Sequence, residues 1–358
     1  QVPIFVFPRK KESHKYVFMK KKKLLWQLPF LAFLIIGTVV IVGRQKSVPY
    51  QHDEGRIFGT TYHITYQSDD NLKKEIEETL KAVDQEFSMF NPQSTVALIN
   101  EGKRPTLSDD FLEVYQLAQQ VNEESDGAFD ITVAPLVNAW GFGFKNQQMP
   151  NNHQIDSLRR LVGMEHVSLA GAKGSQYVRF QRPRMMLDFS AIAKGYGTDR
   201  VARLLMSHDV ANFMVEIGGE VYAKGNSEKR LPWRIGVSKP VDDPDNDAQE
   251  LETVLNVTNQ AMATSGNYRN FYYKGGRKYA HTIDPKTGRP VQHSLLSATV
   301  LAPTCAEADA YATSFMVMGL DKARQVLERK KQLKAYFIYQ NAQGGLSVWK
   351  SEGLDERK

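Results

Sequence analysis

The chain has 358 residues, of which 42% are hydrophobic and 24% charged, a composition typical of a globular protein with a sizeable core. Its net charge of +6 is confined to the N-terminus, because residues 1–46 carry ten basic residues and one acid and everything after them sums to −3. A mildly acidic globular part excludes nucleic acid as the main partner, and the single cysteine, Cys305, excludes an intramolecular disulfide.

The N-terminal segment predicts a membrane anchor. Residues 1–18 form an extension without a usable pattern, and residues 19–46 hold Met19, four lysines and then nineteen uncharged residues, 24–42. An uncharged run of nineteen residues is just long enough to span a bilayer core. The basic flank indicates a cytoplasmic N-terminus with the large domain on the other side. A cleaved signal peptide is the alternative, but no small-residue cleavage site follows the apolar run.

A linker, residues 47–55, leads to a main domain at 56–350 and a tail at 351–358. In "TYHITY" Tyr62, Ile64 and Tyr66 alternate, which predicts a strand. Apolar residues then recur at helical spacing and predict two helices, 71–87 and 109–124.

From residue 184 the pattern is strand, helix, strand, at 184–189, 190–208 and 212–219. A helix is expected at 306–318. Together these elements predict an α+β fold in which strands outnumber helices. The further expected strands cover 233–238, 253–258, 278–283, 295–301, 335–340 and 346–350.

The helix "AEADAYATSFMVM" carries a candidate metal site. Asp309 and Thr313 are four residues apart, so they lie on one face of the helix. A carboxylate and a hydroxyl are hard oxygen ligands, which suit Mg²⁺ and not zinc. The same spacing also fits a small-residue helix packed in the core.

The stretch "LDFSAIAKGYG" suggests a phosphate site. Asp188 is expected at a strand end and Ser190 at the start of a helix, whose free amides attract anions. Lys194 in the first turn would add positive charge. A capping serine beside a solvated lysine is the other interpretation.

His281 opens "HTIDPKTGRP", a predicted strand that runs into a turn. An imidazole can accept a proton near neutral pH, although a lone histidine in a strand is more often structural. The eight histidines show no zinc-ligand spacing, and the chain has no G-x-S-x-G elbow.

Seven motifs, taken in order, closely resemble those of the FAD:protein FMN transferases, the ApbE-like family. They are "FGTTYHITY", "SMFNPQSTVALIN", "FDITVAPLVNAWGFG", "LDFSAIAKGYGTDRVARLL", "VEIGGEVYAKG", "HTIDPKTGRP" and "AEADAYATSFMVMG". The resemblance covers about residues 55–349. It implies an ApbE-like fold of two related α/β halves with FAD bound between them, preceded here by one N-terminal anchor helix.

The resemblance also implies an activity and its partners. Such an enzyme is a Mg²⁺-dependent transferase that cleaves FAD, attaches FMN to a threonine of an acceptor protein through a phosphoester bond, and releases AMP. The implied acceptors are subunits of membrane redox complexes with a segment similar to Ser-Gly-Ala-Thr. With the anchor, this places the catalytic domain on the periplasmic side of the bacterial inner membrane.

Matched by position, the family's site residues fall on twelve residues of this chain, one of which contributes a backbone ligand. His281 falls on the general base. The Mg²⁺ ligands correspond to Asp309, Thr313 and the backbone carbonyl of Ala191. The positions that line FAD are Phe58, where the family commonly has methionine, and Phe90, Ala139, Trp140, Gly141, Asp188, Lys194 and Ile283.

Two alternative functions remain open: an FAD pyrophosphatase that gives FMN and AMP, and a flavin-binding protein without turnover.

Overall fold

The computed structural model describes residues 28–38, 48–143, 149–241, 250–268 and 271–357. The chain divides into two units, Gln1–Pro49 and Tyr50–Lys358. In the first unit, residues 28–38 form a helix with largely exposed apolar side chains. The predicted anchor at 24–42 lies partly outside the described residues. Within those residues, no helix is both long and apolar enough to cross a membrane.

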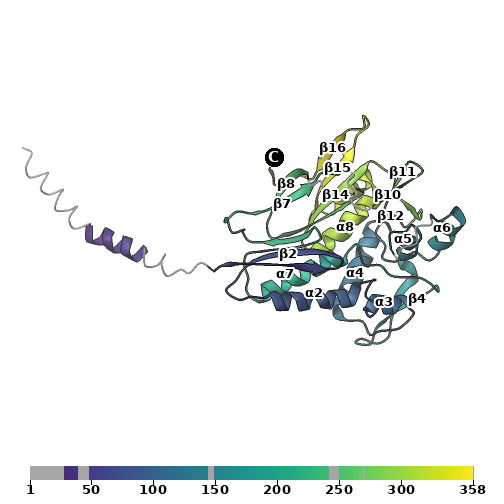
Figure 1. Ribbon diagram of the computed structural model, residues 1–358, viewed down its shortest axis with the longest axis horizontal. Helices are drawn as coiled ribbons and strands as arrows, with labels where there is room; N and C mark the ends of the chain where they lie inside the picture. The colour runs from purple at the N-terminus through teal and green to yellow at the C-terminus, as the bar shows by residue number, and fades with distance from the viewer. Residues whose placement is uncertain (1–27, 39–47, 144–148, 242–249, 269–270, 358) are drawn as a thin grey trace, which may run out of the picture. The chain divides into compact units, whose positions relative to one another are not determined.

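The second unit is built on an eight-stranded sheet in which all neighbouring strands are antiparallel (Figure 1). The sheet is continuous from one edge to the other. Its first strand begins within the stretch expected to be a linker. In spatial order the strands are β1 (Tyr50–Ile57), β2 (Thr60–Gln67), β5 (Phe213–Ile217), β6 (Glu220–Lys224), β9 (Gln260–Gly266), β14 (Leu295–Ala302), β15 (Lys334–Gln340) and β16 (Leu346–Lys350).

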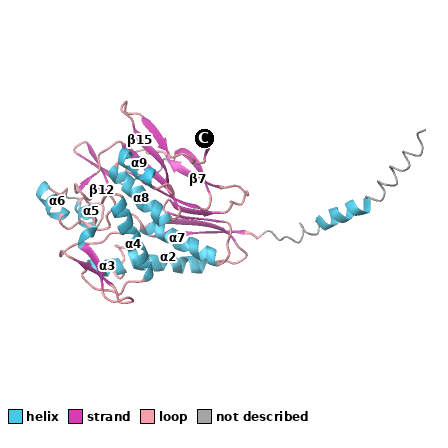
Figure 2. Ribbon diagram, turned by 180° about the vertical axis from the view of Figure 1, so that it is seen from behind, coloured by secondary structure: helices cyan, strands magenta, loops and turns pink. Residues whose placement is uncertain are grey.

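Helices lie against one face of this sheet, as Figure 2 shows from behind. The predicted helices at 71–87 and 109–124 are confirmed, and the second starts where Ser108 accepts the Phe111 N–H. Helix α7 packs on β5 and β6, α8 on β9 and β14, and α9 on β15. The bounds are α2 (Lys73–Phe87), α4 (Asp109–Glu124), α7 (Ala193–Ser207), α8 (Cys305–Met318) and α9 (Leu320–Arg329).

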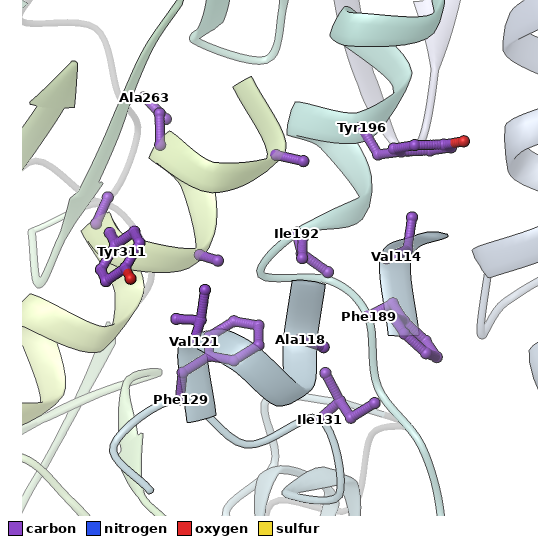
Figure 3. Packing of buried hydrophobic residues seen from close by; sticks show 14 of the residues in the cluster. Val114, Ala118, Val121, Phe129, Ile131, Phe189, Ile192, Tyr196, Ala263 and Tyr311 are labelled. Carbon is purple, nitrogen blue, oxygen red and sulfur yellow. The ribbon is translucent and has the colours of Figure 1, made fainter. Parts of the chain in front are cut away.

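Four clusters of buried apolar residues form in the described part of the chain, and two of them show how the layers on either side of the large sheet are joined. The larger one lies beneath the helices, and Figure 3 shows side chains of α4 such as Val114 and Ala118 near Phe189 and Ile192. On the other face, a three-stranded sheet packs on β6, β9, β14 and β15 through a second core. Its strands are β7 (Trp233–Ser238), β8 (Leu251–Val257) and β17 (Glu356–Arg357).

Short elements complete the second unit. Among them, α5, α6, β10, β11 and β12 gather at one end of it (Figure 1). The short elements are α3 (Thr95–Asn100), α5 (Ala134–Ala139), α6 (Asn152–Arg159), a 3₁₀ turn at Met164–His166, β3 (Val167–Ala170), β4 (Tyr177–Phe180), β10 (Phe271–Lys274), β11 (Arg277–Ala280), β12 (Ile283–Asp284) and β13 (Arg289–Pro290).

The prediction of a strand at 184–189 is wrong. Arg184 lies in a turn with a φ of +69°, and residues 185–189 pair with no strand, because their polar backbone groups bind elsewhere. The Leu187 N–H donates to Asn100 Oδ1 at 2.7 Å, and Asn100 Nδ2 donates back to the Leu187 carbonyl at 2.9 Å. The Asp188 N–H donates to the Ile131 carbonyl at 2.6 Å. These bonds satisfy the buried backbone without a sheet.

Asp199 of α7 joins that helix to the start of α8. Its buried carboxyl leads us to expect that the stability of the protein depends on pH. Its two oxygens accept the N–H groups of Cys305 at 2.7 Å and Ala306 at 2.9 Å. Burial raises the pKa of the Asp199 carboxyl to about 7, against these backbone hydrogen bonds. A carboxyl whose folded pKa is raised contributes stability that is fully present below its unfolded pKa and is lost as pH rises through 7.

The free energy of unfolding should therefore fall by about 2 kcal/mol between pH 5 and pH 7, relative to an Asp199→Asn variant. Urea denaturation of both proteins across this range measures the difference. Parallel pH profiles for the two proteins would contradict the assignment.

Candidate active site

The loop before α7 differs from the prediction, because the helix begins at Ala193 and not at Ser190. Asp188 Oδ1 instead accepts the Ser190 N–H at 2.8 Å and the Ser190 hydroxyl at 2.5 Å. This local turn fixes the Asp188 carboxylate just before the helix.

Among the described residues, one carbonyl just before α7 accepts no hydrogen bond from the first turn of the helix. In an α-helix the Gly195 N–H would donate to the Ala191 carbonyl. Here the Gly195 N–H donates to Asp309 Oδ2 at 3.1 Å, and no backbone bond from Gly195 to Ala191 is found among the described residues. The Ala191 carbonyl is therefore available to another partner, as the resemblance implied for a metal ligand.

Gly195 also lets α7 and α8 approach closely. A Cβ atom at Gly195 would lie 2.3 Å from the Cys305 carbonyl oxygen and 2.8 Å from Ala306 Cα. Both are backbone atoms, which cannot turn away as a side chain can. The absence of a side chain at Gly195 is thus a condition for the Gly195–Asp309 contact.

Gly195→Ala should destabilise the protein by about 1–3 kcal/mol, because the added methyl group forces the helices apart. Gly197→Ala is the matched control: its Cβ would approach side chains and no backbone, the Phe58 ring at 2.7 Å, which can rotate, and Val83 Cγ1 at an ordinary contact distance of 3.7 Å. Urea denaturation of both variants is the measurement. An equal or larger loss in Gly197→Ala would contradict the proposed helix contact.

Three charged side chains meet where α7, α8 and β6 come together. Lys194 Nζ lies 3.0 Å from Glu220 Oε1 and 3.8 Å from Asp309 Oδ2. Asp309 is 4% exposed and Glu220 3%, whereas the Lys194 side chain keeps 28% of its surface exposed. We call these three residues the charged triad.

Glu220 was not predicted as a site residue. Its signal in the sequence is an acid directly after the paired glycines of "EIGGE", at the first position of β6. Glu220 Oε2 is buried and has no hydrogen-bond partner among the described residues. A buried carboxylate oxygen without a partner is costly, so it indicates a missing group nearby.

The pKa values of the triad reflect burial and mutual charge. Burial raises the pKa of Glu220 to about 7, although the Lys194 ammonium opposes the rise. Burial likewise raises the pKa of the Asp309 carboxyl against Lys194. Burial alone would lower the pKa of Lys194, but Asp309 and Glu220 together raise it above its ordinary value. The ammonium is therefore retained.

The donor set around Asp309 fits a hard divalent cation. With both carboxylates ionised the triad has a net charge of −1, which burial makes unfavourable and which a cation would offset. Asp309, the Thr313 hydroxyl one turn later and the Ala191 carbonyl would supply three oxygen donors, which suit Mg²⁺. In the described part of the chain no three His, Cys, Asp or Glu side chains cluster, so the set depends on the hydroxyl and the carbonyl.

His281 does not lie in a strand, contrary to the prediction of a strand at 278–283. It occupies a bend between β11 and β12, and its side chain is half-buried. The His281 ring meets the Phe142 ring edge to face, with centroids 6.4 Å apart. The bend turns the imidazole toward the segment that follows α5.

A row of stacked rings connects β10 and β11 to the end of α5. Trp140 stacks on Tyr279 at 5.7 Å, Tyr279 on Tyr272 at 5.5 Å, and Tyr272 on Phe142 at 5.3 Å. The Tyr272 hydroxyl donates to the Trp140 carbonyl at 3.2 Å. The segment around Trp140 forms the C-terminus of α5, which ends at Ala139, and Gly141 follows with a φ of +84°.

The turn after His281 is held in place by this aromatic segment. The Gly288 N–H donates to the Asp284 carbonyl at 2.8 Å, and the Gly288 carbonyl accepts the Trp140 indole N–H at 2.8 Å. Ile283 is buried in one cluster with Trp140 and Leu136. Because β12 also contacts α8, the turn connects the segment of His281 to the helix of Asp309.

The two remaining candidates lie on turns near the helices. Phe58 sits in the turn between β1 and β2 with a φ of +52°, and its ring lies over Gly197, one helical turn after Lys194. Phe90 follows α2 and is 70% exposed. The structure thus groups the candidates into the triad region and the aromatic region, with Phe58 beside the first.

Comparisons with known proteins show which family this chain is similar to. The model of the ApbE family matches residues 58–337. The FAD:protein FMN transferase of Haemophilus influenzae is 37% identical over 313 residues, which cover 84% of this chain and 89% of that protein. The FAD:protein FMN transferase of Escherichia coli K12 is 34% identical over 295 residues, with 80% and 83% covered.

Solved structures share the fold. The flavin transferase ApbE from Vibrio cholerae superposes with a TM-score of 0.75 at 33% identity, covering 85% of this chain and 97% of that chain. The flavinyl transferase ApbE of Pseudomonas stutzeri in its apo form gives a TM-score of 0.74 at 31% identity, with 85% and 95% covered.

Proposed function

This chain belongs to the ApbE family of FAD:protein FMN transferases, and from that membership we propose that it transfers FMN from FAD to a threonine of an acceptor protein in a Mg²⁺-dependent reaction. AMP is the leaving product. The observation that carries the proposal is the charged triad, in which Asp309 accepts the Gly195 N–H, the donor that a regular helix would direct to the Ala191 carbonyl.

His281 is the proposed general base. The threonine Oγ attacks the phosphorus on the FMN side of the pyrophosphate, and an Oγ–P bond forms. The P–O bond to the AMP phosphate breaks, and AMP leaves with the electron pair. The hydroxyl proton passes to the His281 imidazole, a group that accepts protons near neutral pH.

The other residues bind, orient and neutralise. Lys194 would face the anionic pyrophosphate, since an ammonium favours phosphate oxygens. Asp309, Thr313 and the Ala191 carbonyl would hold Mg²⁺, which supplies charge neutralisation at the phosphates. The stacked rings around Trp140, together with Phe58, Phe90 and Ile283, offer apolar surface to the flavin.

An acceptor assay tests the proposal. The protein is incubated with FAD, Mg²⁺ and an acceptor domain that carries a segment similar to Ser-Gly-Ala-Thr, and covalent flavin is detected by in-gel fluorescence. A fluorescent acceptor band with AMP release is the expected result. FMN and AMP without a labelled band would indicate a pyrophosphatase, and bound FAD without AMP a flavin-binding protein.

We also propose that residues 24–42 anchor the protein in the inner membrane with the catalytic domain on the periplasmic side. The support is the uncharged run behind four lysines. In spheroplasts, externally added protease should degrade the domain, and the domain should sediment with membranes until detergent is added. Protection from protease in intact spheroplasts would contradict this topology.

A further inference from the structure

The charged triad is not symmetric about its ammonium. Lys194 Nζ is at hydrogen-bond distance from Glu220 Oε1, 3.0 Å, and at the longer distance of 3.8 Å from Asp309 Oδ2. Glu220 therefore holds the ammonium, and the ammonium stands back from Asp309. Asp309 Oδ2 takes its hydrogen bond from the Gly195 N–H instead.

This asymmetry matters because an ammonium and a divalent cation compete for the same carboxylate. The lysine stem is flexible and its head is a compact point charge. Without the charge of Glu220, the remaining carboxylate in the triad is Asp309, and the Lys194 ammonium would move onto it. In a buried site that contact would be strong, because the surroundings screen charge poorly.

We propose that Glu220 is a positioning residue that holds the Lys194 ammonium away from Asp309 and so keeps the Asp309 carboxylate open to a divalent cation. The inference rests on the metal site of the proposed function and adds a role for a residue outside the predicted ligand set. Glu220 acts through Lys194 in this arrangement and not as a ligand.

A double-variant cycle separates a role of Glu220 in positioning Lys194 from a role as a metal ligand. The measured quantity is metal binding to the free protein, without FAD or acceptor. Mn²⁺ is the probe, with unbound Mn²⁺ measured by electron paramagnetic resonance and Mg²⁺ added as competitor. Glu220→Gln should weaken Mn²⁺ binding about 10-fold, the lower range for a residue that orients a ligand. Lys194→Met should bind Mn²⁺ at least as tightly as the wild-type protein.

The decisive protein is the double variant Glu220→Gln/Lys194→Met. Without the ammonium there is nothing left to restrain, so the double variant should bind Mn²⁺ as Lys194→Met does. A double variant as weak as Glu220→Gln would overturn the inference, since Glu220 would then act as a ligand or through the fold. Unchanged binding in Glu220→Gln would overturn it as well.

Two further measurements keep the outcomes distinct. Glu220→Asp, which retains the charge, should bind Mn²⁺ more tightly than Glu220→Gln, and the reverse order would count against the restraint. If the wild-type protein binds no Mn²⁺, both the proposed metal site and this inference fail. If the wild-type protein binds Mn²⁺ and the double variant does not recover, only the role of Glu220 fails.

Discussion

His281→Ala is expected to lose FMN transfer by about 10³-fold while FAD binding remains unchanged. The reason is that the threonine hydroxyl is a weak nucleophile until a base takes its proton, and the imidazole is the proposed base. Its bend between β11 and β12 is held by the turn that Gly288 anchors to Trp140. Acceptor flavinylation measures the first effect, and quenching of flavin fluorescence measures FAD binding.

A second histidine provides the control. His153 lies exposed on α6, so His153→Ala should transfer FMN at the wild-type rate. Normal transfer by His281→Ala would remove His281 from the mechanism. A variant of His281 that also loses FAD binding would indicate that the imidazole supports the flavin and not the proton transfer.

Asp309→Asn should reduce Mg²⁺-dependent turnover by at least about 100-fold, which corresponds to about 3 kcal/mol of lost charge stabilisation. The amide has nearly the same shape and can still accept the Gly195 N–H, but it lacks the charge that a cation requires. Release of AMP from FAD at increasing Mg²⁺ concentrations is the measurement.

Asp199→Asn serves as the matched control for Asp309→Asn. Asp199 is also buried between α7 and α8, but both of its oxygens already accept backbone N–H groups. Its variant should keep the Mg²⁺ response of the wild-type protein and differ only in stability. Full turnover of the wild-type protein in the presence of a chelator would refute the metal assignment to Asp309.

The sequence predicted the elements whose signals are local. The helices at 71–87, 109–124 and 306–318 were found to within a few residues, because apolar spacing and capping side chains act over one or two turns. The order of the seven motifs identified the family, which the comparisons confirm. Asp309 and Lys194 were named from the same motifs, and the structure brings them to 3.8 Å.

Only the tertiary structure decided how the segments between these motifs are held. The sequence predicted a strand at residues 184–189. In the structure, the Leu187 N–H instead donates to the side chain of Asn100, which lies 87 positions earlier in the chain. Residue 281 read as part of a strand, yet it lies in a bend whose following turn is tied to Trp140, 148 positions before Gly288.

The charged triad shows the same division. Sequence alone determined that this chain belongs to a flavin transferase family, because the types and order of the motif residues are local properties of the chain. That Glu220 faces Lys194, and that the Gly195 N–H, 114 positions from Asp309, binds its carboxylate, was decided by packing. Burial and the distance between charges depend on partners brought close only when the sheet and helices assemble.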